Sequence, residues 1–274
     1  GICGQKKIGH TGTLDPAATG VLPVCLGSGT KLCDMLTDRD KEYVAELLLG
    51  VETDTQDTTG RVLRESPVTV TEEEVSRACL SFLGDYDQIP PMYSALKVDG
   101  KKLYELARAG KEVERKARRV RILELEILEM RLPVVKLRVV CSKGTYIRTL
   151  CSDIGQKLGC GGAMQSLQRT KAGRFRLEDA LTLGDLQQLK DSGELERVVQ
   201  PVDSLFEETP VLHVTAEAAR LLENGNALFP AQFAETVTPE PERWVRVYRP
   251  DGRFAGIYAY EEQKRWYRPV KMFL

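Results

Sequence analysis

The loop formed by residues 10–23 carries the side chain best suited to chemistry, the carboxylate of Asp15. Pro16 disfavours a helical backbone at Asp15, and Gly12 and Gly20 permit turns that other residues avoid, so the loop can be held rigidly. A rigid loop suits a pre-positioned reactive group, and an aspartate can act as a covalent nucleophile. An isolated Leu-Asp-Pro is more often a surface turn in which the aspartate bonds its own backbone, so the rest of the chain must decide.

Four motifs follow one another along the chain. The loop reads His-Thr-Gly-Thr-Leu-Asp-Pro and then Ala-Thr-Gly-Val-Leu-Pro, and it is followed by Lys41-Glu42-Tyr43, by the segment 88–115 and by Cys141–Leu150. This set resembles the active-site motif, the tyrosine motif, the insertion of the stand-alone branch and the arginine motif of the TruB-type tRNA pseudouridine synthases. The resemblance covers nearly the full chain. It implies isomerisation of uridine to pseudouridine in the T-loop of tRNA, at position 55, without cofactor or guide RNA.

The resemblance assigns catalytic roles to three residues. Asp15 would be the nucleophile that attacks either the sugar or the base of the flipped-out nucleotide. Burial would raise the pKa of Asp15, so a fixed cation is needed, and the planar guanidinium of Arg148 offers a two-pronged match to a carboxylate. Tyr43 is predicted to stack on the uracil, and its phenol could also help to move the proton that leaves the base carbon.

Further residues are predicted to contact the substrate. His10 would stack into the gap left by the flipped base, and Tyr146 would shape the pocket near Arg148. Lys143 and Arg169 would neutralise phosphates.

A strongly basic segment spans residues 97–121. It holds ten Lys or Arg against four acids, a net charge of +6 in a chain whose net charge is −1. Concentrated positive charge on an acidic background is typical of nucleic-acid binding, although a solvated face would have the same composition. The RNA-contacting residues predicted in this segment are Lys101, Lys102, Arg115 and Arg118.

The spacing of apolar residues predicts the elements that position these groups. Tyr43 begins an alternating strand that stops at Gly50, and strands around 123–127 and 135–141 flank a turn at Pro133. A helical pattern begins at Ile147, with Thr145 as its N-cap, so Arg148 would lie in the first turn. We therefore predict an α+β fold, with a mixed, mostly antiparallel sheet flanked by helices, as in the pseudouridine synthase fold.

The sequence predicts two domains. Residues 1–200 would form the catalytic domain, with an inserted arm at about 90–119, and residues 210–274 a small β-rich unit that resembles the PUA module that binds RNA. The same C-terminal pattern would fit an unspecialised β-cap. The family's Lys-Pro-x-Gly motif does not precede the loop, so we expect an N-terminal segment to be missing.

The composition favours a cytoplasmic protein. No apolar run approaches the ~18 residues of a membrane span, and no basic-then-apolar leader opens the sequence. Seven cysteines without a Cys-x-x-Cys pair suggest free thiols, and two distant histidines give no metal-ligand spacing. We expect a monomer that binds tRNA through its T-arm and needs no metal, membrane or protein partner.

Three other functions compete with this interpretation. A retaining hydrolase could use Asp15 as nucleophile, but it would need a second carboxylate, and none is evident near the loop. A non-catalytic RNA-binding or RNA-folding protein could use the basic arm, although it would not need Asp15. A guide-RNA-dependent pseudouridine synthase shares the catalytic motif but lacks this type of insertion.

Overall fold

The structure is a computed structural model, and it describes residues 1–98, 100–236 and 238–274. The chain divides into two compact units. The large unit consists of residues 11–23 and 34–180, and the small unit of residues 1–10, 24–33 and 181–274. Residues 1–10, 24–33 and 181–200 therefore belong to the same unit as the C-terminal strands, whereas the sequence assigned them to the first domain. The functional division at residues 200–210 stays a prediction.

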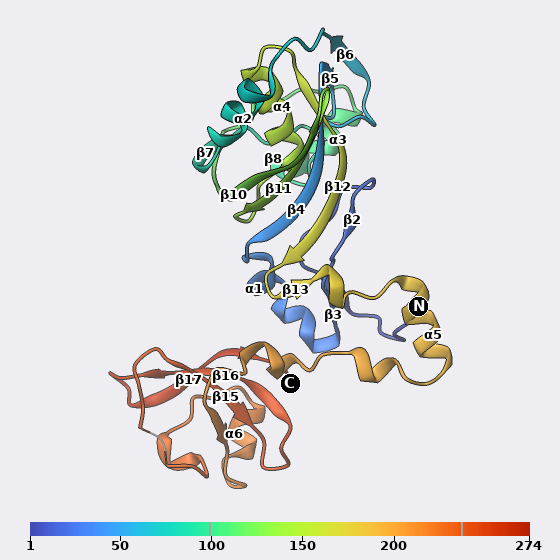
Figure 1. Cartoon of the computed structure of the whole chain (residues 1–274). Coiled ribbons are helices and arrows are strands. Elements are labelled where there is room, and N and C mark those ends of the chain that lie inside the picture. Colours follow the sequence, from blue (N-terminus) through green and yellow to red (C-terminus); the bar gives the residue numbers. More distant parts are fainter. Residues whose placement is uncertain (99, 237) are drawn as a thin grey trace. The chain divides into compact units, whose positions relative to one another are not determined.

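One sheet forms the centre of the large unit (Figure 1). All its neighbouring strands are antiparallel except β2, which pairs in parallel with β12. The predicted α+β fold with a mostly antiparallel sheet is thus confirmed. In spatial order the strands are β13 (Phe175–Arg176), β12 (Gly162–Ala172), β4 (Lys41–Leu49), β11 (Val134–Cys141), β10 (Arg118–Arg131) and β7 (Gly84–Gln88), with β2 (Thr19–Gly20) beside β12.

The core lies between this sheet and two helices. Alternate residues of β4, namely Ala45, Leu47 and Leu49, are buried, because successive side chains of a strand point to opposite faces. They pack with side chains of α2 (Glu72–Leu80) and α4 (Ile147–Lys157) in one apolar cluster. The predicted strand that begins near Tyr43 is confirmed.

Both helices begin at a residue with an extended backbone. The Thr71 hydroxyl accepts from the backbone N–H of Glu74, whose carboxylate accepts from the N–H of Thr71, and this capping box starts α2. The predicted N-cap of α4 is wrong. Tyr146 occupies that position, because the hydroxyl of Thr145 donates instead to the carbonyl of Ser142, at 2.9 Å.

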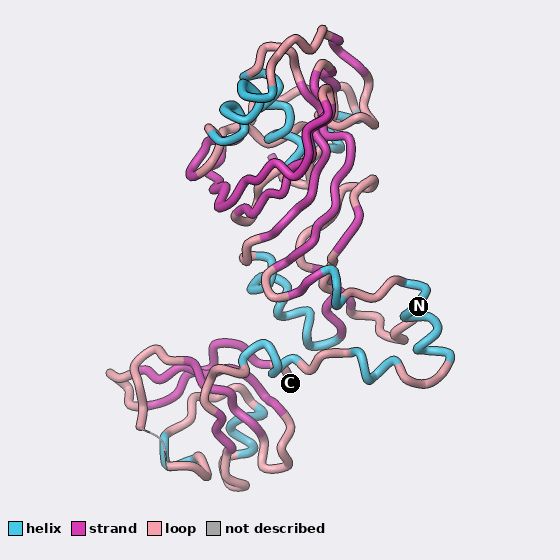
Figure 2. The backbone as a smooth tube through the Cα atoms, in the orientation of Figure 1, coloured by secondary structure: helices cyan, strands magenta, loops and turns pink. Residues whose placement is uncertain are grey.

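Smaller elements complete the large unit. They are short hairpins and short helices, and Figure 2 distinguishes helices from strands by colour. They are β5 (Val51–Thr53) with β6 (Val62–Glu65), β8 (Lys97–Val98) with β9 (Lys101–Lys102), α3 (Leu103–Arg108), and α1 (Cys33–Thr37), which begins at the unit boundary.

The small unit has its own sheet and its own core. Four strands follow in the order β14-β15-β16-β17 and enclose an apolar cluster that includes Leu222, Leu228 and Tyr258. This strand-rich architecture was predicted for the C-terminal residues. The elements of the unit are β1 (Ile8–His10), β3 (Val24–Leu26), α5 (Leu183–Asp191), β14 (Val211–His213), α6 (Ala219–Glu223), β15 (Trp244–Tyr248), β16 (Phe254–Glu261) and β17 (Trp266–Met272), with short 3-10 helices that include Gly27–Leu32 and Val202–Phe206.

The seven cysteines are free thiols, as predicted. None of the helices that the described residues form is long and apolar enough to cross a membrane.

Candidate active site

Backbone hydrogen bonds fix the loop that carries Asp15. The N–H of Thr11 donates to the carbonyl of Pro23 at 3.2 Å, which closes the base of the loop. The N–H of Ala18 donates to the carbonyl of Asp15 at 2.9 Å and forms the turn. Beyond this turn, β2 pairs with β12, so the loop is anchored to the main sheet. The rigidity predicted from the glycines and Pro16 therefore rests on tertiary pairing as well.

Arg169 holds this loop from the interior. Its side chain is buried, Nε donates to the carbonyl of Val21 at 2.7 Å, and Nη2 donates to the carbonyl of Gly12 at 3.1 Å. The predicted phosphate contact of Arg169 is therefore corrected, because a buried guanidinium that bonds two loop carbonyls is not free for an RNA backbone. The sequence missed this role because it did not predict strand β12.

Arg148 faces the carboxylate of Asp15. Nη2 of Arg148 donates to Oδ1 at 3.1 Å, and Nε lies 2.8 Å from Oδ2 without forming a hydrogen bond to any described residue. The Arg148 side chain is 5% exposed and the Asp15 side chain 36% exposed. The structure thus brings together the two residues that the sequence predicted to pair. The pairing is one hydrogen bond plus one close ionic contact.

Two carbonyl groups and a second acid complete the surroundings of Arg148. Nη1 donates to the carbonyl of Thr55 at 3.1 Å, and Nη2 to the carbonyl of Tyr93 at 3.0 Å. Oδ2 of Asp57 lies 3.5 Å from Nη1. These contacts fix the plane of the guanidinium, which can therefore present its edge to Asp15 without reorganising.

Asp57 is the site residue that the sequence analysis missed. It lies in the acidic turn after β5, where Oδ1 accepts from the hydroxyl of Thr55 at 2.8 Å and from the N–H of Thr59 at 3.0 Å. The concentration of acids in residues 52–60 was the available signal, but it is also typical of a solvated turn. A second carboxylate thus lies near the loop, although none was evident from the sequence.

Burial raises the pKa of Asp15 above its ordinary value of 3.8. The positive charge of Arg148 opposes this shift, and the negative charge of Asp57 adds to it. Arg148 therefore offsets part of the cost of burying the Asp15 carboxylate.

The charge of Asp15 also acts on the pKa of two tyrosines, Tyr43 and Tyr146. Burial raises the pKa of both Tyr43 and Tyr146, and the charge of Asp15 adds to the shift in each. Tyr43 faces Arg169 across the pairing of β4 with β12, and the cation of Arg169 acts against its shift. Arg148 and Arg118 likewise act against the shift of Tyr146. Tyr43 thus pairs in register with the arginine that holds the loop, and Tyr146 precedes Arg148 by two residues, while their contacts with a nucleotide stay predictions.

The other predicted contacts fall into two groups. Lys101 and Arg118 are exposed, and the ammonium of Lys102 lies 5.4 Å from the ring centre of Tyr104. Arg115 and Lys143 have protein partners. Nη1 of Arg115 donates to the carbonyl of Pro90 at 3.1 Å, and Nζ of Lys143 lies 2.8 Å from Oδ1 of Asp38.

Two residues of the sequence analysis have no assigned place at the site. His10 is exposed at the end of β1 and belongs to the small unit, so its role beside Asp15 stays a prediction. Asp99, one of the acids in the basic segment, lies outside the described residues.

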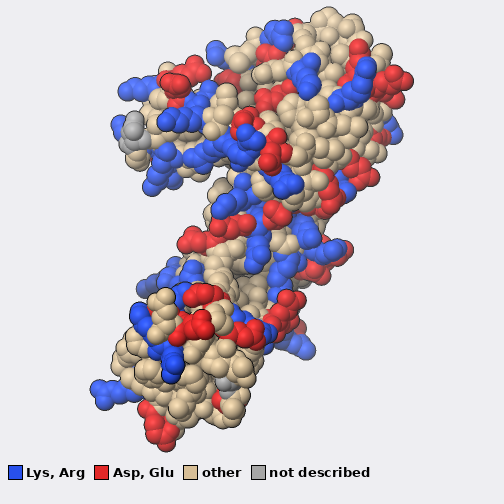
Figure 3. All heavy atoms as spheres, turned by 90° about the vertical axis from the view of Figure 1, so that its left-hand side faces the viewer, with Lys and Arg blue, Asp and Glu red and all other residues tan. Residues whose placement is uncertain are grey.

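Charge and cavities add little to the definition of the site. Figure 3 shows basic and acidic side chains interspersed over the face in view.

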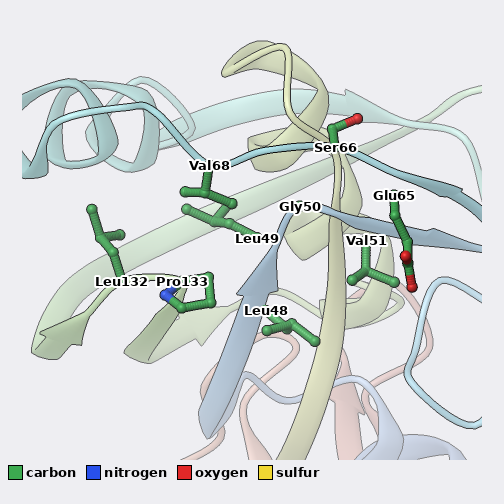
Figure 4. Close-up of a pocket in the computed structure, with 9 residues that line it drawn as sticks. All are labelled: Leu48, Leu49, Gly50, Val51, Glu65, Ser66, Val68, Leu132 and Pro133. Carbon is green, nitrogen blue, oxygen red and sulfur yellow. The ribbon is translucent and has the colours of Figure 1, made fainter.

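A cavity of about 420 Å³ lies at the far end of β4 from Tyr43, where Leu48, Val68 and Pro133 line it (Figure 4). The lining also includes Glu65 and Ser66, but no cationic side chain lies among its residues. Among residues 1–98, 100–236 and 238–274, no three His, Cys, Asp or Glu side chains gather as a metal site.

Known proteins resemble this chain along most of its length. Residues 1–147 match the family described as TruB family pseudouridylate synthase (N terminal domain), and residues 148–207 match the tRNA pseudouridylate synthase B C-terminal domain. The chain is 51% identical to the tRNA pseudouridine synthase B of Lachnoclostridium phytofermentans, over 100% of this chain and 92% of that protein. It is 42% identical to the tRNA pseudouridine synthase B of Clostridium tetani, over 98% of this chain and 90% of that protein.

A solved structure extends the comparison to the fold. In a Cbf5–Nop10–Gar1 complex, one chain superposes with a TM-score of 0.69 and 26% identity, over 100% of this chain and 78% of that one. The resemblance read from the four motifs is therefore confirmed along most of the sequence. The chain belongs to the TruB family of pseudouridylate synthases, which are isomerases.

Proposed function

We propose that this protein isomerises uridine to pseudouridine in tRNA, with the T-loop uridine at position 55 as its target and Asp15 as its nucleophile. The observation that carries the proposal is the pairing of Asp15 with the buried Arg148 beside Tyr43 and Tyr146. The names of the relatives, which are tRNA pseudouridine synthases, support tRNA as the substrate.

The reaction needs a nucleophile and no redox step. The bond between C1′ of the ribose and N1 of uracil breaks, the base turns, and a bond forms between C1′ and C5. A proton leaves C5 and one is gained at N1, so atoms and electrons balance. The carboxylate of Asp15 can hold the intermediate by bonding either C1′ or the uracil ring, and it leaves when the new bond forms.

The surroundings of Asp15 suit this role. The carboxylate must be ionised to attack, and Arg148 stabilises its negative charge while Asp57 and two carbonyls balance the guanidinium. The exposed fraction of Asp15 leaves room for a nucleotide to approach. A flipped-out uracil would displace water from the carboxylate and thereby strengthen its electrostatic interactions.

Tyr43 serves as the stacking platform in this proposal. Its raised pKa keeps the phenol neutral, so it can stack and donate a hydrogen bond but is a weak base at neutral pH. Tyr146 forms a second wall beside Arg148.

The substrate is bound by surfaces outside the pocket. Lys101 and Arg118 supply exposed positive charge, half-buried Lys102 adds to it, and the strand-rich C-terminal unit acts as a PUA-like RNA-binding module. Single-stranded loops are where proteins can splay and read bases, which favours the T-loop over a helical stem. A tRNA substrate is consistent with the cytoplasmic location and the monomer predicted from the sequence.

The test is to incubate the purified protein with unmodified tRNA, with an isolated T-arm stem-loop, and with an unstructured RNA of the same sequence, without guide RNA. Nucleoside-resolved mass spectrometry then maps pseudouridine. We expect modification of the tRNA and the stem-loop only. Modification of all three alike would contradict T-loop specificity, and modification only after a guide RNA is added would favour guide-dependent action. No product under either condition would favour a role in RNA binding or folding.

A further inference from the structure

The side-chain amide of Gln88 forms hydrogen bonds with both the N–H and the carbonyl of Tyr146. Gln88 ends strand β7 and is 1% exposed. Its Oε1 accepts from the N–H of Tyr146 at 2.7 Å, and its Nε2 donates to the carbonyl of Tyr146 at 2.9 Å. One side chain therefore satisfies both polar backbone groups of a single site residue, as a neighbouring strand would.

Tyr146 is the residue from which α4 starts. It holds the N-cap position with an extended backbone, and its side chain makes no capping hydrogen bond. The N–H of an N-cap residue has no partner within its own helix, and Gln88 supplies that partner. Arg148 follows two residues later, so the direction in which α4 begins sets where its guanidinium points relative to Asp15.

A second contact ties the same strand to the same helix. Oη of Tyr86 accepts from Nε2 of Gln88 at 2.6 Å and donates to Oδ2 of Asp153 at 3.0 Å. Tyr86 and Gln88 are two residues apart on β7 and therefore point to the same face. Asp153 lies seven residues after Tyr146 along the chain, so two successive turns of α4 are held by β7.

We propose that Gln88 is a positioning residue that orients Tyr146 and Arg148 for the reaction at Asp15. The inference rests on the proposed function, because it assumes that these two residues act on the nucleotide. Gln88 does not face Asp15 in any contact of the described residues, so it acts through the start of α4. Buried amides with all partners satisfied are rigid, which suits a group that must hold others in place.

The first test replaces Gln88 by glutamate. Gln88→Glu keeps the shape and the acceptor for the Tyr146 N–H, but it sets an oxygen against the Tyr146 carbonyl. We expect the single-turnover rate at saturating tRNA to fall by roughly 10- to 100-fold, since small displacements of reacting groups have effects of that order. The dissociation constant for tRNA should stay within about two-fold, because the RNA-binding surfaces are unchanged. Gln156→Glu, the same change on the exposed side of α4, is the control and should leave both quantities unchanged.

A second test separates positioning from stability. In Gln88→Glu/Asp153→Asn, the hydroxyl of Tyr86 can donate to the new carboxylate at position 88 and accept from the new amide at position 153. Both hydrogen bonds of Tyr86 are thus restored, with donor and acceptor exchanged. The donor to the Tyr146 carbonyl is still absent. Positioning predicts that the melting temperature recovers while the rate stays low. Recovery of the rate together with the melting temperature would show that Gln88 only stabilises the fold.

Two further results decide the remaining cases. Should Gln88→Glu fail to fold, Gln88→Asn keeps an amide that is one methylene too short to reach both backbone groups, and it should show the same loss of rate. A wild-type rate in either folded variant would show that Gln88 does not position Tyr146 and Arg148. The proposed function would stand in that case, because the wild-type protein would still modify tRNA. Absence of pseudouridine with the wild-type protein would instead overturn the proposed function.

Discussion

Gly20 lies so close to Arg169 that a Cβ atom at position 20 would stand 2.2 Å from the Arg169 carbonyl oxygen. The backbone of Gly20 also has a φ of +107°, a conformation that residues with side chains rarely adopt. The backbone of the loop 10–23 therefore contacts the backbone of β12 at Gly20, where only glycine fits. The buried guanidinium of Arg169 donates hydrogen bonds to the carbonyls of Gly12 and Val21 in the same loop.

Arg169→Gln should loosen the loop and destabilise the large unit. The change leaves buried carbonyls without donors, which costs about 1–3 kcal/mol for each group. We expect a lower melting temperature together with a lower single-turnover rate. Arg176→Gln, at an exposed position of β13, should alter neither quantity. A variant with normal stability and weakened tRNA affinity would instead restore the phosphate contact predicted for Arg169.

Arg148→Lys should reduce catalysis more than binding. An ammonium provides charge, but it cannot maintain the planar set of contacts to Asp15 and to the carbonyls of Thr55 and Tyr93. We expect the single-turnover rate at saturating tRNA to fall on the order of 10²-fold. Filter binding of tRNA gives the affinity in parallel. A near-normal rate would show that the geometry of the guanidinium is not required.

The pH dependence of kcat/KM should report the ionisation of Asp15 in the free protein. Because burial raises the pKa of this group, activity should be lost on acidification at a pH above the ordinary aspartate value of 3.8. Asp57→Asn removes a negative charge that raises this pKa, so the acid limb should move to lower pH.

Asp54→Asn, in the same turn, is the control for the pH profile, and its acid limb should stay in place. Each profile is normalised to its own plateau, so that a general loss of rate does not shift the midpoint. An acid limb that moves to higher pH in Asp57→Asn would contradict this account of the electrostatics.

The basic residues of the segment 97–121 should determine the salt dependence of tRNA binding. Neutralising Lys101, Lys102 and Arg118 removes three phosphate contacts, so the slope of log K against log salt should flatten by about 2. Arg115→Gln alone should change the slope little, because its guanidinium bonds the Pro90 carbonyl. Neutralising Arg131 and Lys136, on the hairpin of β10 and β11, is the matched control. An unchanged slope in the triple variant would mean that the arm is only a solvated face.

The parts of the fold that were predictable are those with a local signal. Strand β4 shows apolar alternation, and the capping box of α2 is fixed by two residues three positions apart. Strands β7 and β12 were not predicted, because their inward positions carry Gln88 and Arg169 where the pattern would require apolar residues. Those side chains can be buried only because distant backbone groups satisfy them.

The candidate site divides in the same way. Asp15, Tyr43 and Arg148 were found through motifs, whereas the place of Asp57 depends on how the turn after β5 folds back to Arg148. Thr145 was chosen as a helix cap from residue type alone, but its hydroxyl had a nearer carbonyl to bond. Long-range hydrogen bonds thus account for most of what the sequence analysis missed.

A single-turnover assay of Asp15→Asn with unmodified tRNA decides whether Asp15 is the nucleophile, with the dissociation constant measured on the same preparation. The asparagine keeps the shape of the side chain and cannot act as a carboxylate nucleophile. The account predicts no detectable pseudouridine at the T-loop position and tRNA affinity within about two-fold of the wild-type protein, because the basic arm and the pocket walls remain. Pseudouridine formed by the variant at the wild-type rate would contradict the assignment of Asp15 as the nucleophile.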